Sequence, residues 1–273
     1  MKRDFFPHPA LHGLVDTYSA FAYTARTPRT QWIAPTTTAA LSFGFGGAVR
    51  TESATNARPG VSAPSRAALP LTGALIGRHE GRIRGITLRL GPIGAYALFG
   101  VPMHLWDVPW LDPVDLLPAR SRELVERLGA AAGPEEQARL LDAALLPLVE
   151  RGPRISPEVV RVWHELHRTR GRRPVRELAA EVGWSVRHLE RLFRVHVGRS
   201  PAAIARTLRF GTALRAWRTG HSLARAALLA GYGDQAHFNH ACKAMTGLSP
   251  TRLPADLLDW HPGPRPHTRL ALR

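Results

Sequence analysis

The sequence predicts an α+β fold of two domains, a β-rich N-terminal domain with helices after it and an all-α C-terminal domain. Short strand-like runs fill the first 115 residues, helical periodicity begins near residue 116, and the C-terminal half contains an internal repeat. Charge divides the chain similarly: residues 1–150 carry 15 basic and 13 acidic side chains, whereas residues 151–273 carry 22 and 8. A strongly basic half beside a nearly neutral one indicates two units, of which the basic one prefers a polyanion.

Residues 1–115 have the pattern of strands separated by glycine turns. Strands are expected in residues 39–49, 73–90 and 94–101, and a loop in the Ser-, Thr- and Pro-rich residues 51–70. Side chains alternate after Gly85, which indicates a half-buried strand. The apolar members are Ile86, Leu88 and Leu90, and the polar ones are Thr87 and Arg89. Frequent turns favour a small, cupin-like barrel that binds an effector or mediates self-association.

Residues 116–152 predict two helices that connect the halves. Leu124, Val125 and Leu128 recur at helical spacing, and Pro134 begins a second apolar stripe. These helices could pack on the β-rich domain or pair with a second copy of the chain, and homodimerisation is left open.

The basic half contains two copies of one pattern. Residues 175–184 match residues 223–232 at an offset of 48, and the match continues at an offset of 49 as far as Ser200-Pro201 and Ser249-Pro250. In each copy a short amphipathic helix ends at a glycine, and a second helix begins after a capping residue. The turn glycines are Gly183 and Gly231, and the caps are Ser185 and Asp234. Helix, glycine turn and capped helix are typical of a helix-turn-helix unit.

The second helix of each unit has a polar outer face suited to nucleic acid. On a helical wheel Val186, Leu189, Leu192 and Phe193 point inward in the first copy, and Phe238, Ala241 and Cys242 in the second. The outward residues are Arg187, Glu190, Arg191 and Arg194 in the first copy, and Gln235, Ala236, Asn239, His240 and Lys243 in the second. Arg side chains bond guanine, and Gln or Asn bond adenine, in the major groove.

Residues 201–218 predict one helix between the two units. A helix of about 16 residues in this range would span about 24 Å and could hold two reading helices about one DNA turn apart. Its positive side chains are Arg206, Arg209, Arg215 and Arg218.

The stretches LAAEVGWSVRHLERLFRVHVGRSP and AGYGDQAHFNHACKAMTGLSP resemble the two units of the DNA-binding module of AraC/XylS-type transcription regulators. The resemblance implies a double helix-turn-helix domain over residues 153–255, followed by a basic, Pro-rich tail over residues 256–273. It also implies a sensor-like N-terminal domain. The base-facing positions of the family fall on Arg187, Glu190 and Arg191 in the first unit, and on Gln235, Ala236 and His240 in the second.

These features predict a sequence-specific transcription regulator that binds double-stranded DNA and responds to an unidentified small molecule or to self-association. Two alternatives remain, a metal-dependent cupin-type enzyme tethered to a DNA-binding module and a non-specific architectural DNA binder. No phosphate-binding glycine loop or nucleophile elbow occurs, so no catalytic activity and no cofactor are expected. His79, Glu80 and His104 are too scattered for a cupin-type metal site, so no metal is expected.

Composition excludes further classes of protein. One cysteine, Cys242, excludes a disulfide framework, and its inward position favours a small core residue over a nucleophile. No apolar run approaches about 20 residues, and the N-terminus lacks a secretory signal, so a cytoplasmic location without membrane contact is expected. Trp32, Trp106 and Trp110 could line an effector pocket, although a place in the core is favoured.

Overall fold

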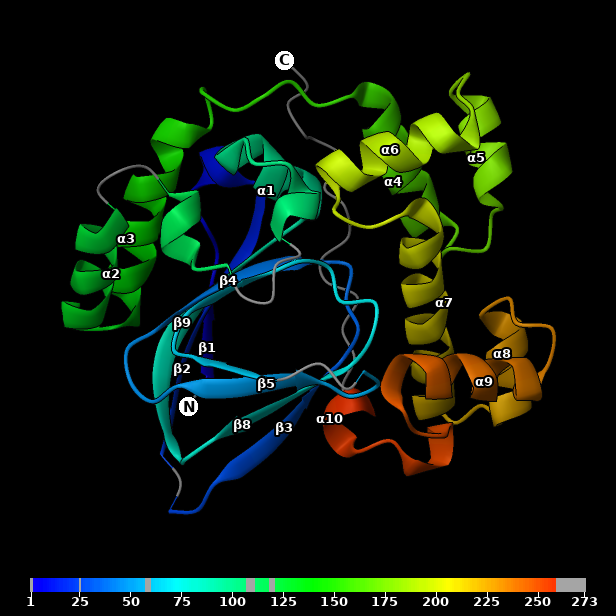
Figure 1. The fold of residues 1–273 in the computed structure, drawn as a ribbon, viewed down its shortest axis with the longest axis horizontal. Coiled ribbons are helices and arrows are strands. Elements are labelled where there is room, and N and C mark those ends of the chain that lie inside the picture. The colour runs from blue at the N-terminus through cyan, green and yellow to red at the C-terminus, as the bar shows by residue number, and fades with distance from the viewer. Residues whose placement is uncertain (1, 25, 57–59, 107–110, 118–120, 259–273) are drawn as a thin grey trace.

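A computed structural model describes the chain except for residues 1, 25, 57–59, 107–110, 118–120 and 259–273. Figure 1 shows two parts, sheets covered by helices on one side of the molecule and a wholly helical part on the other. The predicted α+β class with an all-helical C-terminal domain is confirmed.

The strands form two antiparallel sheets that stay open instead of closing into one barrel. The five-stranded sheet has the order β1 (Lys2–Phe5), β2 (Val15–Thr24), β9 (Arg82–Leu90), β4 (Ala39–Gly44) and β7 (Arg66–Ala68). The four-stranded sheet has the order β3 (Arg29–Ile33), β8 (Leu75–His79), β5 (Val49–Ser53) and β6 (Val61–Ala63). The barrel expected from the turn pattern is therefore realised as two separate sheets.

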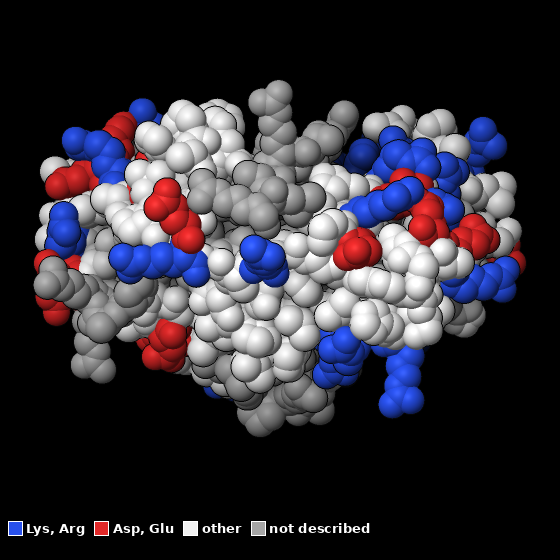
Figure 2. Space-filling model, turned by 90° about the horizontal axis from the view of Figure 1, so that it is seen from above, with Lys and Arg blue, Asp and Glu red and all other residues white. Residues whose placement is uncertain are grey.

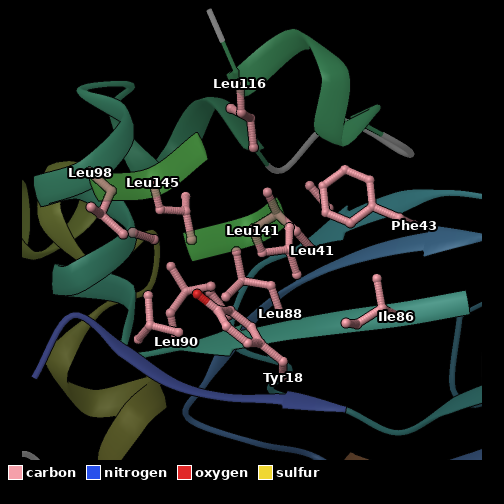
Figure 3. Packing of buried hydrophobic residues seen from close by; sticks show 14 of the residues in the cluster. Tyr18, Leu41, Phe43, Ile86, Leu88, Leu90, Leu98, Leu116, Leu141 and Leu145 are labelled. Atoms are coloured by element: carbon pink, nitrogen blue, oxygen red, sulfur yellow. The ribbon is translucent and has the colours of Figure 1, made fainter. Parts of the chain in front are cut away.

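The two faces of β9 have different surroundings. Ile86, Leu88 and Leu90 are buried in the main core, where Figure 3 shows them beside Tyr18 and Leu41. The opposite face, with partly buried Thr87 and exposed Arg89, lines a cavity. The alternation therefore predicted the strand and its buried face, but not what the polar face meets.

The helices after the sheets cover the apolar face of the larger sheet. They are α1 (Pro92–Phe99), α2 (Ser121–Ala130) and α3 (Pro134–Leu145). Leu141 and Leu145 of α3 enter the main core (Figure 3), and the Tyr18 hydroxyl donates a 2.7 Å hydrogen bond to Asp142. Helix α3 thus packs on its own N-terminal sheet, the first of the two arrangements considered above.

Two local predictions are wrong. Residues 94–101, expected as a strand, belong mostly to α1, which starts at Pro92 and ends where Gly100 adopts a φ of +70°. Gly94 lies so close to the backbone of Leu14 that an added Cβ would come within 2.3 Å of the Leu14 oxygen. This close approach explains a glycine inside a helix. Residues 51–70, expected as a loop, contain the end of β5 and all of β6 and β7.

The C-terminal part contains α4 (Pro157–Arg168), α5 (Val175–Glu181), α6 (Val186–His196), α7 (Pro201–Arg218), α8 (Leu223–Leu229), α9 (Gln235–Thr246) and α10 (Ala255–Leu258). Figure 1 shows α7 as a rod with α6 near one end and α9 near the other. Ile204 and Leu208 join the core around α4, α5 and α6, whereas Phe210 and Leu214 join the core around α8 and α9. One helix therefore serves two hydrophobic cores, as the internal repeat requires.

Short 3₁₀ turns complete the described structure. They are Pro9–Leu11, Met103–Trp106, Pro113–Leu116, Leu146–Leu148 and Pro250–Arg252.

Candidate nucleic-acid interface

The two helix-turn-helix units have the same turn geometry. The N–H of Trp184 donates to the Ala179 carbonyl at 2.9 Å, and the N–H of Tyr232 donates to the Ala227 carbonyl at 3.0 Å. The preceding glycines, Gly183 and Gly231, have φ angles of +72° and +83°. Only glycine adopts this region without strain, so the repeated glycine fixes the angle at which each second helix leaves its turn.

Both second helices begin at a side-chain cap. The Ser185 hydroxyl accepts from the N–H of His188 at 3.2 Å, and the Asp234 carboxylate accepts from the N–H of His237 at 2.7 Å. The two histidine rings stand edge-on to the turn aromatics, His188 to Trp184 at 4.7 Å and His237 to Tyr232 at 5.1 Å between centroids. These histidines pack within their own units.

The outward residues of both helices fall into two exposure classes. Most are exposed: Arg187, Arg191 and Arg194 on α6, and Gln235, Ala236, His240 and Lys243 on α9. Glu190 and Asn239, which are equivalent at the offset of 49, are only partly exposed. The two helices thus present similar surfaces with different chemistry, strongly cationic on α6 and mostly neutral on α9.

The wheel placed Val186 inward, and that expectation is wrong. Val186 is 39% exposed and is the first residue of α6. The internal repeat contained the signal, because Val186 is equivalent to Gln235, the exposed first residue of α9. The remaining inward residues fit the wheel, since Leu189, Phe193, Phe238 and Cys242 are fully buried and Leu192 and Ala241 partly so.

The rod helix adds cations to the same part of the molecule. Arg206, Arg215 and Arg218 are exposed. Arg209 is partly buried, with its guanidinium 5.3 Å from the centre of the Tyr232 ring. Three of the four arginines predicted for this helix are therefore accessible to a polyanion, and Arg209 packs against the turn of the second unit.

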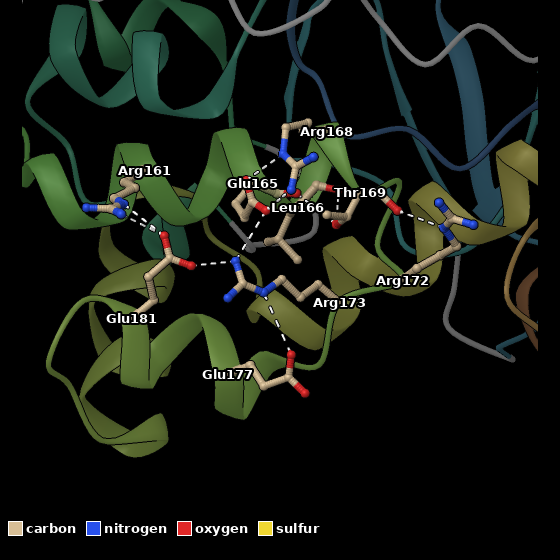
Figure 4. A network of polar contacts seen from close by, with 9 residues as sticks. All are labelled: Arg161, Glu165, Leu166, Arg168, Thr169, Arg172, Arg173, Glu177 and Glu181. Carbon is tan, nitrogen blue, oxygen red and sulfur yellow. Dashed lines mark hydrogen bonds and ion pairs between the residues drawn. The ribbon is translucent and has the colours of Figure 1, made fainter.

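The carboxylates near α4 and α5 are engaged in one ion-pair network (Figure 4). Arg173 contacts Glu165, Glu177 and Glu181, and Arg161 pairs with Glu181 at 2.8 Å. The two guanidinium groups lower the pKa of Glu181 below its usual value. This network neutralises charge on the first helices of the domain, and its residues lie on α4, on α5 and between them.

The other carboxylates of this half have structural partners as well. Glu158 accepts a hydrogen bond from Ser156, Asp234 caps α9, and Asp256 accepts from the backbone N–H of Trp32. Among the described residues after 150, only Glu190 lacks such a partner. Figure 2 shows carboxylates beside Lys and Arg side chains at the end of the molecule that contains the C-terminal helices. The acids thus offset arginines elsewhere, and the cations of α6 remain uncompensated except by Glu190.

One N-terminal segment, residues 69–75, contacts the C-terminal ends of both second helices. The Arg199 side chain, just after α6, donates to the Pro70 carbonyl at 2.9 Å. The N–H of Ala74 donates to the carbonyl of Met245 in α9 at 2.7 Å. This segment leaves the N-terminal ends of α6 and α9, with their exposed side chains, free of these contacts.

The same segment borders a cavity of about 970 Å³ between the two sheets. Trp32 lines this cavity, whereas Trp106 is a core residue at 2% exposure and Trp110 lies outside the described residues. Most of the predicted tail, residues 259–273, also lies outside them.

The remaining candidate reactive groups have ordinary surroundings. Cys242 is buried, and burial raises the pKa of its thiol to about 11, which opposes nucleophilic reactivity. In the part of the chain that the structure describes, no three His, Cys, Asp or Glu side chains gather as a group able to hold a metal. None of the described helices combines the length and apolar character that a membrane span requires.

Residues 178–255 match a family model described as a helix-turn-helix domain. The chain has no significant match among curated proteins. Among solved structures, it is similar to ToxT from Vibrio cholerae at 1.65 Å resolution, with 10% identity, a TM-score of 0.47 and coverage of 86% of this chain and 96% of ToxT.

Two ligand-bound structures of ToxT are similar to a comparable extent. One holds an unsaturated fatty acid, with 9% identity, coverage of 85% and 93%, and a TM-score of 0.44. The other holds (E)-4-(8-methylnaphthalen-1-yl)but-3-enoic acid, with 8% identity, coverage of 86% and 97%, and a TM-score of 0.46.

The repeated units and the matched segment define the class of protein as a DNA-binding transcription regulator. Residues 178–255 form a helix-turn-helix domain of the AraC type, as the sequence motifs indicated.

Proposed function

We propose that this protein regulates transcription by reading two successive major grooves of double-stranded DNA with α6 and α9. The observation that carries the proposal is the repeat itself, two units with the same turn and cap geometry mounted on the 18-residue helix α7. A helix of this length spans about 27 Å. With a reading helix beside each end, this spacing suits half-sites about one DNA turn, or roughly 34 Å, apart.

Side chains near the N-terminal ends of α6 and α9 are assigned to base edges. Base contacts are proposed for Arg187, Glu190 and Arg191 in the first unit, and for Gln235, Ala236 and His240 in the second. Exposed Arg194 and Lys243, one turn further along, are assigned to phosphates. Asn239, at the edge of the outer face of α9, is assigned to a base or a phosphate. Exposed Val186 joins this set, because a valine at the start of a reading helix suits the methyl group of thymine.

Selection of binding sites from a random DNA pool tests this function. An enriched motif with two half-sites about one helical turn apart is the expected result. Binding without any enriched motif would instead identify a non-specific architectural binder and overturn the proposal.

Replacing Arg191 with alanine should weaken binding to the selected site by about 1–3 kcal/mol and relax preference at one base position. Arg191 is exposed on the outer face of α6, where a guanidinium can bond guanine in two places. Competition titrations against selected and random DNA measure this. Arg82→Ala, at an exposed arginine of β9, is the matched control. Equal weakening on both DNAs would show that Arg191 binds phosphate.

The N-terminal domain is proposed to control DNA reading through a small-molecule effector or through self-association. The cavity supports the effector, because residues 69–75 border it and also contact the ends of both reading helices. An occupant that shifts this segment would change how α6 and α9 are held relative to each other.

Replacing Arg199 with alanine tests the part of this segment that holds α6. A hydrogen bond to a charged group contributes about 1.5–3 kcal/mol, so the preference for the best half-site spacing should fall by about tenfold or more. Binding to a series of selected sites with the half-sites moved apart by single base pairs measures the preference. An unchanged spacing profile, equal to that of Arg82→Ala, would show that the segment does not position the helices.

A further inference from the structure

The cavity between the sheets has the size and walls of a small-molecule site. Its volume of about 970 Å³ lies at the upper end of the range of about 300–1,000 Å³ usual for such sites. Both sheets contribute apolar side chains to its lining, among them Phe21, Trp32, Ile33, Leu69, Leu75 and Ile83. Hydroxyl groups from the larger sheet add polar partners, including Thr17, Ser19 and Thr87.

Arg66 places a cation in this cavity. From β7 in the larger sheet, its Nη1 donates to the Thr51 hydroxyl of β5 in the other sheet at 2.9 Å, so the side chain reaches from one sheet to the other. Burial lowers the pKa of Arg66 below its usual value. Among the described residues, no carboxylate lies within ion-pair distance of its guanidinium.

The other charged groups that line the cavity are already balanced or lie at its edge. Asp4 pairs with Lys2 at 3.8 Å. Asp256 is exposed, and its carboxylate accepts a hydrogen bond from the Trp32 N–H at 3.1 Å. Arg89 is exposed. Burial and the nearby Arg29 lower the pKa of His79, which favours its neutral form. Arg66 thus remains a partly buried cation whose described partner is a neutral hydroxyl.

A cation withdrawn from water and left without an anion destabilises the protein, whereas a bound carboxylate would balance it. The planar guanidinium bonds a carboxylate with two parallel hydrogen bonds, and one cation balances one negative charge. We propose that the cavity binds a monocarboxylate with an apolar body, its carboxylate on Arg66 and its body against the aromatic and aliphatic walls. This inference rests on the proposed sensing role of the N-terminal domain and names the class of its effector.

The position of the site explains how such a ligand would act. Leu69, Leu71 and Leu75 line the cavity and belong to the segment that touches the ends of α6 and α9. A ligand body packed against these leucines would therefore contact a segment that touches both reading helices.

Thermal unfolding of the full chain with paired probes tests the inference. Octanoate and benzoate are each compared with octanamide and benzamide, which have nearly the same shape without the charge. We expect at least one acid to raise the Tm by about 2–4 °C more than its amide. The variant Arg66→Met should lose this difference, whereas the control Arg82→Met should keep it.

The ligand-free variants give a second readout. Because Arg66 is an uncompensated cation in the cavity, Arg66→Met should raise the Tm of the free chain by about 2–4 °C, and Arg82→Met should leave it unchanged. If neither acid exceeds its amide, or if Arg66→Met retains the difference, the inference is overturned. The assay contains no DNA, so its failure leaves the DNA-reading proposal standing, and a failed DNA selection would not remove a measured acid site.

Discussion

Raising the salt concentration from 50 to 200 mM is expected to weaken DNA binding by about five-hundredfold. Each phosphate neutralised by Lys or Arg releases condensed counterions, so the logarithm of the affinity falls linearly with the logarithm of the salt concentration. Arg187 and Arg191 are assigned to bases, which leaves five exposed cations of the reading and rod helices as candidates for phosphate contact: Arg194, Lys243, Arg206, Arg215 and Arg218. With all five engaged, the slope would be about −4.5.

Fluorescence anisotropy titrations at four or five salt concentrations measure this slope. Arg194→Gln should reduce its magnitude by about 1 while leaving the selected motif unchanged, because Arg194 is assigned to phosphate and not to a base. A slope shallower than about −2 would mean that at most two cations contact DNA, and the proposed surface would be wrong.

The unequal charge of α6 and α9 predicts which unit contributes more to phosphate binding. In α6 three exposed arginines have one carboxylate beside them, whereas exposed α9 residues carry one lysine and no acid after the cap. Of the five candidate phosphate contacts, four lie on α6 and the rod, so phosphate affinity should come mostly from these two helices. The second unit, with Gln235 and His240, is left to contribute selectivity.

The C-terminal domain could be predicted from sequence because its constraints are local. A turn glycine with positive φ and a cap two or three residues later fix each unit within about 20 residues. Because the pattern occurs twice, the assignment of Gly183 and Gly231 as turn residues does not depend on a single match. The placement of Val186 failed because a wheel treats the first residue of a helix like its middle, although no preceding helical turn covers it.

The N-terminal domain was harder to predict because its constraints are not local. The polar side chains of β9 would suit solvent equally well, and only the second sheet turns their surroundings into a cavity. The strands β6 and β7 have three residues each, too few to show alternation. Helix α1 was mistaken for a strand because it is apolar all round, although Pro92 at its start and Gly100 at its end were usable signals.

The core of the second unit is another feature that no single stretch of the sequence reveals. At the offset of 49, Leu189 corresponds to Phe238 and Phe193 to Cys242, so the large residue moves from the second position to the first. All four are fully buried. The small Cys242 is therefore accompanied by a larger neighbour one turn earlier, which the sequence shows only when the two units are compared position by position.

Replacing Phe238 with alanine is accordingly expected to lower the free energy of unfolding by about 3–5 kcal/mol. The Phe238 ring lies 5.4 Å from Tyr232 and 6.5 Å from Phe210 between centroids, so it joins α9 to its turn and to α7. Because the second unit has its own hydrophobic core, the loss should fall mainly on α9. Footprinting should then show the second half-site unprotected while the first stays protected.

Urea denaturation followed by tryptophan fluorescence measures the stability, with Leu228→Ala in α8 as the matched control at an exposed site. Leu228 is 54% exposed, so its truncation should cost less than about 1 kcal/mol. A loss below about 1 kcal/mol for Phe238→Ala would show that Tyr232 and Phe210 close over the gap, and α9 would then be held by the rod and by Ala74. Equal loss of both half-sites would show that the two cores on α7 unfold together, which would make the rod a cooperative link between the reading helices and not merely a spacer.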